Sequence, residues 1–324
     1  MNSSDDNKKK SLIKLATNLI SQNQSMEGFK KGLELVDEAL KLDPDYALAW
    51  NLKGNVLIGI AKPEEGVKCL DKAIKLDPKL AAPWYSKALV SQKLGKYEEA
   101  VDYYDRSLEL GFKNFENRYV DITFRKGLIL NQIGRYEDAI ESFDKILKIN
   151  PDSFDALVSK SLTLGFMNRY QEELECLEKV LEIDPKNPMI WANKGAVLNE
   201  LGRFEEALEC TDKAIKILEI EDLGMQNKDQ NEQVTWYVRG NSFIGLKKYD
   251  EALESFNKSL KLYSGEGIQQ IYIDSLIGKG NAFVSLNKCE EALKCYNKAL
   301  ELDPDSELAK IGIDKILSSK SKKL

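Results

Sequence analysis

The chain has 324 residues with 47 basic and 53 acidic side chains, which gives a net charge of −6 at pH 7. Charges of both signs are interspersed rather than gathered in blocks, and this pattern argues against a nucleic-acid-binding surface. No stretch approaches the roughly 18 consecutive apolar residues of a membrane span, and the start from Met1 to Asp6 lacks the apolar core of a signal peptide. We therefore expect a cytoplasmic protein whose partners are neither nucleic acids nor membranes.

The composition also argues against catalysis. The chain contains no histidine, which is the commonest general base and the commonest metal ligand. Its 5 cysteines are an odd number in a chain without a secretion signal, so they do not indicate a disulfide framework. Acidic pairs such as Glu64-Glu65 recur where helices are expected to begin, and there they offset the helix dipole. We expect no catalytic residues, no metal ligands and no cofactor, and hence no enzyme.

In chain order, residues 1–12 are predicted to be disordered, and a unit of about 34 residues then repeats through the chain. A degenerate copy covers 13–46, and complete copies cover 47–80, 81–114, 120–153, 154–187, 188–221, 233–266 and 273–306. Inserts at 115–119, 222–232 and 267–272 follow copies that lack a closing proline, so the second helix of the copy or its loop can run on there. The longest insert is predicted to be a flexible loop. Residues 307–324 are predicted to form a capping helix and a basic tail.

Each copy is predicted to be a helical hairpin. Within a copy, apolar residues recur at positions 4, 8, 11 and 14 with helical spacing, and after a short turn they recur at positions 20, 24, 27 and 28. We name the first helix of each copy A and the second B. A unit this short cannot bury its own apolar face, so successive copies must stack on one another.

Several positions keep their residue type from copy to copy. Tryptophan recurs at position 4, a small residue at position 8, an aromatic residue at position 17 and alanine at position 20. Examples are Trp50, Trp84, Trp191 and Trp236 at position 4, Gly54, Ala88 and Ser161 at position 8, and Ala100, Ala139, Ala207, Ala252 and Ala292 at position 20. This pattern closely resembles the tetratricopeptide repeat family over residues 13–306. The resemblance implies an all-α fold: a right-handed α-α superhelix, or solenoid, of about eight helical hairpins plus a C-terminal capping helix. It also implies a concave groove lined by the A helices.

The chain departs from the family pattern at position 7, where every complete copy carries a basic residue. An ammonium group between apolar positions needs a partner, and position 25 of the preceding copy supplies an acid in six of the seven cases. The predicted pairs are Asp37–Lys53, Asp71–Lys87, Asp105–Lys126, Asp144–Lys160, Glu178–Lys194 and Asp212–Arg239, and the seventh position pairs Asn257 with Lys279. Such pairs would fix the stacking register. An anion-binding stripe is the alternative.

The A helices are expected to line the groove with positions 2, 5, 6, 9, 12 and 13. The resulting peptide-binding candidates are Asn51, Asn55, Tyr85, Leu89, Phe124, Arg125, Leu128, Val158, Leu162, Met189, Asn193, Tyr237, Asn241 and Asn281. We expect the groove to centre on Tyr85, Phe124, Arg125 and Leu128, because aromatic and arginine side chains dominate binding energy when desolvated. A clamp for acidic tails, known in the family, is disfavoured because Asn51 and Asp121 stand where it needs lysines.

The most favoured function is a protein–protein interaction adaptor or scaffold that binds a peptide or helix segment of another protein in this groove. The alternative is a structural solenoid that self-associates through its groove or its ends and has no dedicated peptide ligand. The sequence also predicts a weak joint in the copy 154–187, where Ser161 and Glu173 replace the usual glycine and alanine of the close-packing positions.

Overall fold

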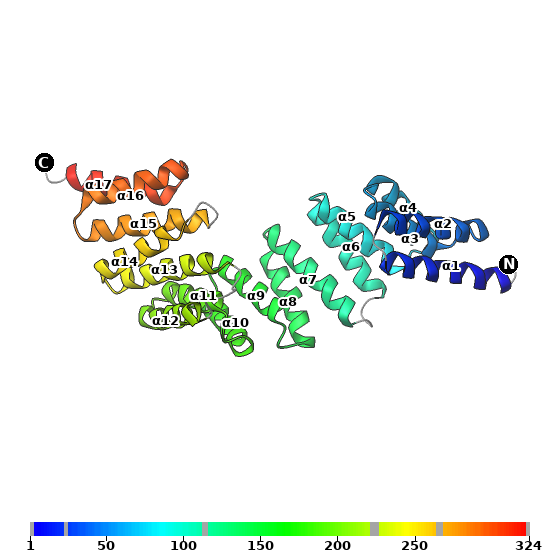
Figure 1. Cartoon of the computed structure of the whole chain (residues 1–324), viewed down its shortest axis with the longest axis horizontal. Coiled ribbons are helices and arrows are strands. Elements are labelled where there is room, and N and C mark those ends of the chain that lie inside the picture. Colours follow the sequence, from blue (N-terminus) through cyan, green and yellow to red (C-terminus); the bar gives the residue numbers. More distant parts are fainter. Residues whose placement is uncertain (1–2, 23–24, 112–115, 221–226, 264–267, 322–324) are drawn as a thin grey trace. The chain divides into compact units, whose positions relative to one another are not determined.

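The protein is described by a computed structural model over residues 3–22, 25–111, 116–220, 227–263 and 268–321. These residues form 17 α-helices, and the parts of the chain so described contain no β-strand. The helices divide into two compact units, Met1–Pro151 and Asp152–Leu324, which are described separately (Figure 1). The prediction of an all-α solenoid built from helical hairpins is confirmed.

Unit 1 consists of four hairpins that stack in chain order. Its helices are α1 (Ser3–Gln22), α2 (Met26–Leu42), α3 (Ala47–Gly59), α4 (Pro63–Leu76), α5 (Ala81–Lys93), α6 (Tyr97–Leu110), α7 (Glu116–Gln132) and α8 (Tyr136–Ile149). Each odd-numbered helix packs against the next even-numbered one, and α2, α4 and α6 pack against the first helix of the following hairpin. Helices α1, α3 and α5 also contact one another in sequence, as expected for A helices along one face.

Unit 2 repeats this arrangement and ends in a single helix. Its helices are α9 (Phe154–Phe166), α10 (Tyr170–Ile183), α11 (Pro188–Glu200), α12 (Phe204–Ile220), α13 (Lys228–Gly245), α14 (Tyr249–Lys261), α15 (Gln269–Ser285), α16 (Cys289–Leu302) and α17 (Glu307–Ser321). Helix α17 packs on α15 and α16, and its Ala309 and Ile316 are buried in one cluster with Ile273 and Tyr296. The last hairpin is thereby covered, within the segment that the sequence assigns to a cap.

The turns between helices A and B share one backbone conformation. The turn residue at position 15 has a positive φ in all seven complete copies, for example 71° at Gly95 and 61° at Ala61. In the turn at Gly95, the amide of Lys96 donates a hydrogen bond of 2.9 Å to the carbonyl of Ser91, five residues earlier. This is the left-handed helix cap that satisfies the last carbonyls of helix A.

At two of the Asp-Pro steps, the proline carbonyl binds the tryptophan of the next copy. Trp50 Nε1 donates a hydrogen bond of 2.8 Å to the carbonyl of Pro44, and Trp191 Nε1 donates one of 2.9 Å to the carbonyl of Pro185. Proline ends the preceding B helix, and its carbonyl becomes the acceptor for the next A helix. At these two steps, the same dipeptide ends one repeat and orients the tryptophan of the following one.

Ion pairs join the predicted positions 25 and 7 of neighbouring copies. The Nζ–oxygen distances are 2.7 Å for Lys53–Asp37, 2.7 Å for Lys87–Asp71 and 2.8 Å for Lys194–Glu178, and Lys126–Asp105 and Arg239–Asp212 also pair. These five predicted pairs are confirmed. The pair Asp144–Lys160 would join the two units and remains a prediction. At the seventh position the ammonium of Lys279 lies 5.8 Å from the centroid of the Phe283 ring.

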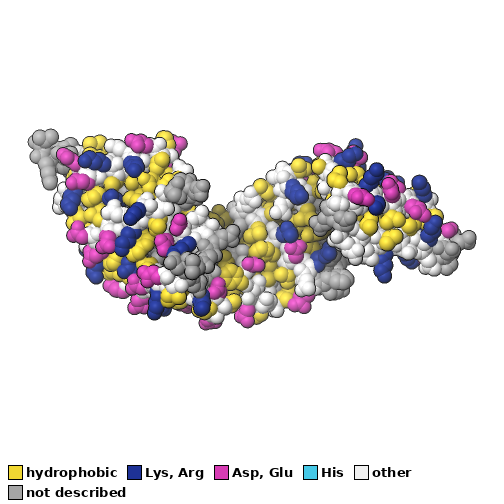
Figure 2. All heavy atoms as spheres, viewed as in Figure 1, with side chains coloured by type: hydrophobic (Ala, Val, Ile, Leu, Met, Phe, Trp, Pro, Cys, Tyr) yellow, Lys and Arg dark blue, Asp and Glu magenta, His cyan; other side chains and the backbone are white. Residues whose placement is uncertain are grey.

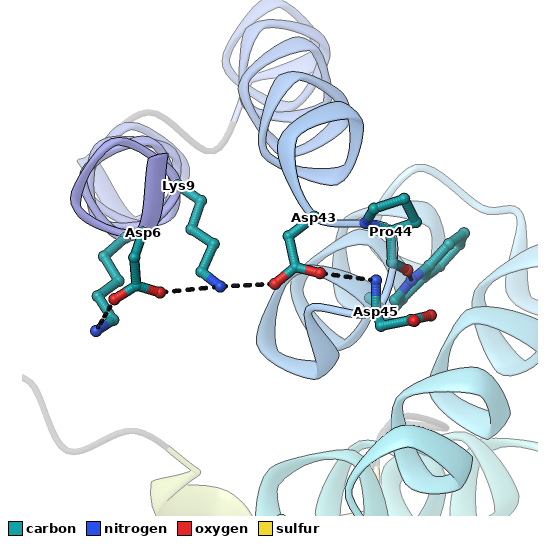
Figure 3. A network of polar contacts seen from close by, with 7 residues as sticks. Asp6, Lys9, Asp43, Pro44 and Asp45 are labelled. Carbon is teal, nitrogen blue, oxygen red and sulfur yellow. Dashed lines mark hydrogen bonds and ion pairs between the residues drawn. The ribbon is translucent and has the colours of Figure 1, made fainter. Parts of the chain in front are cut away.

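The N-terminal segment differs from the prediction. We expected disorder over residues 1–12, whereas α1 begins at Ser3 and packs on α2. Lys9, of which 7% is exposed, lies with its Nζ 2.6 Å from Asp43 Oδ2 and 3.0 Å from Asp6 Oδ1 (Figure 3). Asp43 Oδ1 in turn accepts the amide of Asp45 at 3.1 Å. The polar composition suggested disorder, but these charges have partners in the Asp-Pro turn that follows α2.

The inserts also differ from the prediction. Residues 112–115, 221–226 and 264–267 lie outside the described residues, so the loop predicted over 222–232 is covered in part only. The described parts of the inserts lie mostly in the A helix that follows. Helices α7, α13 and α15 have 17, 18 and 17 residues, against 13 for α3 and α5. Helix α12, with 17 residues, is the B helix that runs on as predicted.

The face drawn in Figure 2 carries charges of both signs between apolar side chains. This agrees with the interspersed charge pattern of the sequence. None of the helices formed by the described residues combines the length and the apolar composition needed to cross a membrane.

Candidate binding groove

A cavity of about 410 Å³ lies in unit 1 between α3, α5 and α7. Four predicted groove residues line it, namely Asn51, Asn55, Tyr85 and Leu89. The remaining lining residues are Ile58, Gly59, Ala82, Ser86, Val90, Lys93 and Arg118. We call this cavity the unit 1 pocket.

The helical repeat explains why these residues meet. On α5 the lining residues Ala82, Tyr85, Leu89 and Lys93 follow one another at intervals of three or four, and on α3 the residues Asn51 and Asn55 do the same. Residues at this spacing share one face of a helix. The α3 and α5 faces are brought together because both are A helices of successive copies.

Tyr85 is held in place by the next A helix. Its hydroxyl donates a hydrogen bond of 3.0 Å to Asp121 Oδ2, and Arg125 Nε donates one of 2.9 Å to Asp121 Oδ1. Burial, and then the nearby charge of Asp121, raise the pKa of the Tyr85 hydroxyl. The guanidinium carbon of Arg118 lies 5.9 Å from the centroid of the Tyr85 ring. Tyr85 thus stays neutral and fixed in orientation at the wall of the pocket.

The charged residues in the wall of the unit 1 pocket are basic. Lys93 and Arg118 line the cavity, and no acidic side chain is among the described residues that line it. Asp121 lies beyond Tyr85 and is paired with Arg125. The wall also contains Asn51 Oδ1, a buried acceptor that receives no hydrogen bond from the described residues. The pocket therefore presents positive charge, an aromatic ring and an unused acceptor.

The other residues of the predicted centre lie differently. Arg125 reaches Tyr85 through Asp121, whereas the Phe124 ring lies 5.9 Å from the Phe143 ring and packs in the hairpin of α7 and α8. Leu128 is exposed on α7, with 42% of its surface accessible. Neither Phe124 nor Leu128 lines the unit 1 pocket.

The remaining candidates belong to unit 2. Val158 and Leu162 lie on α9, Met189 and Asn193 on α11, Tyr237 and Asn241 on α13, and Asn281 on α15. The Tyr237 ring lies 6.3 Å from the Phe256 ring, and Asn281 Oδ1 accepts a hydrogen bond of 2.7 Å from the Tyr296 hydroxyl. Both side chains therefore contribute to the packing of their own hairpins.

Arg118 was missing from the sequence prediction. It falls in the insert 115–119, which has no position in the repeat, but α7 begins at Glu116 and includes it. Arg118 precedes Asp121 by three residues and Arg125 by seven, so all three lie on one face of α7. Extending the helical spacing of α7 toward its N-terminus would have found it.

A second cavity, of about 390 Å³, lies between α4, α5 and α6 of unit 1. Lys68, Lys87 and Lys96 line it together with Glu64 and Glu99, and it includes none of the predicted groove residues. Within the described part of the chain, no three cysteine, aspartate or glutamate side chains gather closely enough to hold a metal ion.

Comparison with known proteins agrees with this architecture. A tetratricopeptide repeat protein from Parabacteroides merdae is 15% identical over 84% of this chain and 98% of its own, with a TM-score of 0.57. YrrB, described as a tetratricopeptide repeat protein with an unusual peptide-binding site, is 24% identical over 59% of this chain and 96% of its own, with a TM-score of 0.51. Because both proteins are less than 25% identical to this chain, the similarity shows a shared fold and nothing more. No curated protein sequence matches significantly.

Family models assign the repeats directly. Models described as tetratricopeptide repeat match residues 47–80, 79–152, 154–187, 176–209 and 232–305. Together these matches cover well over half of the chain, and they include hairpins of both units. The chain therefore belongs to the tetratricopeptide repeat family.

Proposed function

We propose that the chain is a protein-interaction scaffold and that the unit 1 pocket binds a peptide or helix segment of another protein. The observation that carries this proposal is the cavity of about 410 Å³ on the A-helix face, with its basic wall and its fixed tyrosine. Concave sites that combine apolar surface with a few convergent polar groups are the usual binding sites of proteins.

The lining predicts the chemistry of the bound segment. Ile58, Leu89 and Val90 offer apolar contact, and Lys93 and Arg118 offer positive charge. Asn51 Oδ1 lacks a donor, and a backbone N–H of the ligand would supply one. A segment with an apolar side chain next to an acidic one satisfies all three features.

A displayed library of random peptides, selected on the purified chain, tests this proposal. We expect selected peptides to share an acidic residue beside an apolar one and to lose at least about tenfold in affinity with Tyr85→Ala/Arg118→Gln, since desolvated aromatic and arginine side chains dominate binding. The matched control is Arg106→Ala, because Arg106 is exposed on α6 and pairs with Glu109 at 3.0 Å. Peptides that bind the double variant and the wild type equally would contradict the proposal.

Self-association is the second candidate, because α17 exposes apolar side chains. Leu308, Ile311 and Leu317 have 62%, 46% and 54% of their surfaces accessible. Light scattering coupled to size exclusion, over a hundredfold range of concentration, would show a mass increase that Leu308→Ser/Ile311→Ser abolishes. A monomer at all concentrations would exclude this candidate.

A further inference from the structure

Unit 2 contains a buried carboxylate that receives no hydrogen bond from the residues that the structure describes. Glu173 on α10 is 9% exposed, and among the described residues no hydrogen bond or ion pair reaches its carboxylate. It occupies position 20, where most complete copies have alanine. A Cβ atom on Gly165 of α9 would lie 2.9 Å from Glu173 Oε2, so the carboxylate lies against the bare backbone of Gly165.

Two further acceptors lie on α11. Glu200 ends this helix and is close enough to Glu173 for its charge to act on the Glu173 carboxyl. Asn199 Oδ1, in the preceding residue, is buried and receives no hydrogen bond from the described residues. Its amide Nδ2 donates a hydrogen bond of 3.0 Å to the carbonyl of Val238, which fixes which atom of the amide is the oxygen. We call Glu173, Asn199 and Glu200 the acceptor cluster.

The described ion pairs of the neighbouring helices do not neutralise this cluster. Arg169, Lys194 and Arg203 pair with other acids, namely Glu172, Glu178 and Glu206. A further acid, Asp274, lies on α15 near Tyr237 of α13. Burial raises the pKa of the Tyr237 hydroxyl, and the charges of Asp274 and Glu200 raise it further. Asp274 is held by a hydrogen bond of 2.9 Å from Gln270 Nε2.

Two apolar side chains near Gly165 on α9 are exposed. Phe166 directly follows Gly165 and is 66% exposed, and Leu162, one helical turn earlier, is 49% exposed. An exposed aromatic ring on the helix that contacts Glu173 suits a cation on an aliphatic stem.

We propose that the acceptor cluster binds a lysine or arginine side chain of a partner protein. A buried carboxylate without a donor is unfavourable, and a charge-assisted hydrogen bond from a cation satisfies it. The aliphatic stem of that side chain packs on Leu162 and Phe166, and its donors reach Glu173 and Glu200. This second interaction surface lies in unit 2 and does not depend on the unit 1 pocket.

The probe is a short fluorescein-labelled peptide in which arginine alternates with leucine, and its counterpart carries neutral citrulline in place of each arginine. At pH 8 we expect the arginine peptide to bind at least about tenfold more tightly than the citrulline peptide, measured by fluorescence anisotropy. Glu173→Gln and Glu200→Gln should each remove most of this preference. The control Glu209→Gln removes the same charge from the exposed face of α12 and should preserve the preference.

The pH dependence adds an independent readout. Burial, and secondarily Glu200, raise the pKa of the Glu173 carboxyl to about 7, and Gly165, its neighbour on α9, carries no charge. Affinity for the arginine peptide should therefore rise several-fold from pH 6 to pH 8 in the wild type and stay flat in Glu173→Gln. If Glu173→Gln folds poorly because the residue is buried, Glu200→Gln still tests the proposal, since Glu200 is exposed.

Three results would overturn the proposal: equal binding of the arginine and citrulline peptides, an unchanged preference in both cluster variants, or an equal loss in Glu209→Gln. Tyr85→Ala/Arg118→Gln should leave binding of the arginine peptide unchanged, so failure here is distinguishable from failure of the unit 1 pocket.

Discussion

Lys194 of α11 and Glu178 of α10 form an ion pair with an Nζ–Oε1 distance of 2.8 Å. The lysine side chain is 18% exposed, whereas the glutamate is 51% exposed. The ammonium of Lys194 is thus largely covered by the stacked repeats, whereas the Glu178 carboxylate lies at the surface. The ammonium of Lys194 also lies 5.9 Å from the centroid of the Trp191 ring, so the pair connects consecutive copies at the position 4 tryptophan.

A double-mutant cycle of Lys194→Met and Glu178→Gln should give a coupling energy below about 1 kcal/mol, because one partner is solvent-exposed and the attraction is screened. The free energies come from urea unfolding of the four proteins. Arg203→Met with Glu206→Gln is a matched cycle for an exposed pair at the N-terminal end of α12. A Lys194–Glu178 coupling of several kcal/mol would show that the pairs stabilise the stack as well as setting its register.

Glu173→Ala should stabilise the chain by roughly 1–3 kcal/mol at pH 8, because it removes a buried, unpaired carboxylate. The pKa of this carboxyl rises from 4.5 to about 7 in the folded chain, so the unfolded chain loses this proton more readily. Because the folded chain keeps this proton over a range in which the unfolded chain loses it, Glu173 makes the free energy of unfolding fall as the pH rises from about 4.5 to about 7. At pH 5 the variant should gain much less.

Thermal melts of wild type, Glu173→Ala and the exposed control Glu172→Ala at pH 5 and pH 8 would measure this difference. A lower midpoint for Glu173→Ala at pH 8 would mean that Glu173 is satisfied in solution and that the joint between α9 and α10 is sound.

Ala61→Gly should stabilise unit 1 by about 1 kcal/mol. Ala61 has a φ of 61°, which costs an L residue with a Cβ atom roughly 1–2 kcal/mol, and glycine relieves this strain at some cost in unfolded-state entropy. The reciprocal change Gly95→Ala has no steric obstacle, since nothing lies within 4 Å of its Cβ position, but it should destabilise by a similar amount. If Ala61→Gly and Gly95→Ala changed the free energy of unfolding in the same direction in urea melts, this explanation would be wrong.

Lys9→Ala should loosen α1. The Lys9 ammonium donates a hydrogen bond to Asp43 and forms an ion pair with Asp6. It also lies 4.9 Å from the centroid of the Tyr46 ring, and the contacts with Asp43 and Tyr46 join α1 to the Asp-Pro turn after α2. Hydrogen exchange read by mass spectrometry should show faster exchange in α1 and little change in α5 and α6. Lys14→Ala, at an exposed position of α1, is the control. Unchanged exchange in α1 would mean that packing on α2 alone holds this helix.

The repeats could be identified from the sequence because their determinants are local and recur. Trp50 and Trp191 mark equivalent sites, and Pro44 and Pro185 end the B helices through steric exclusion that operates wherever the residue stands. The pairing of Lys194 with Glu178 was predictable for the same reason, since stacking places the same two positions together in successive copies.

Only the tertiary structure decided where the chain departs from its repeat. Arg118 enters the unit 1 pocket because α7 begins ahead of the repeat boundary, and Lys9 of α1 is ordered by an aspartate in the turn that follows α2. Glu173 was recognisable as an anomaly at position 20, but its contact with Gly165 and its proximity to Glu200 depend on how three helices pack. Periodicity determines which residues share a face, whereas the environment of a charge depends on neighbours that only folding brings within a few ångströms.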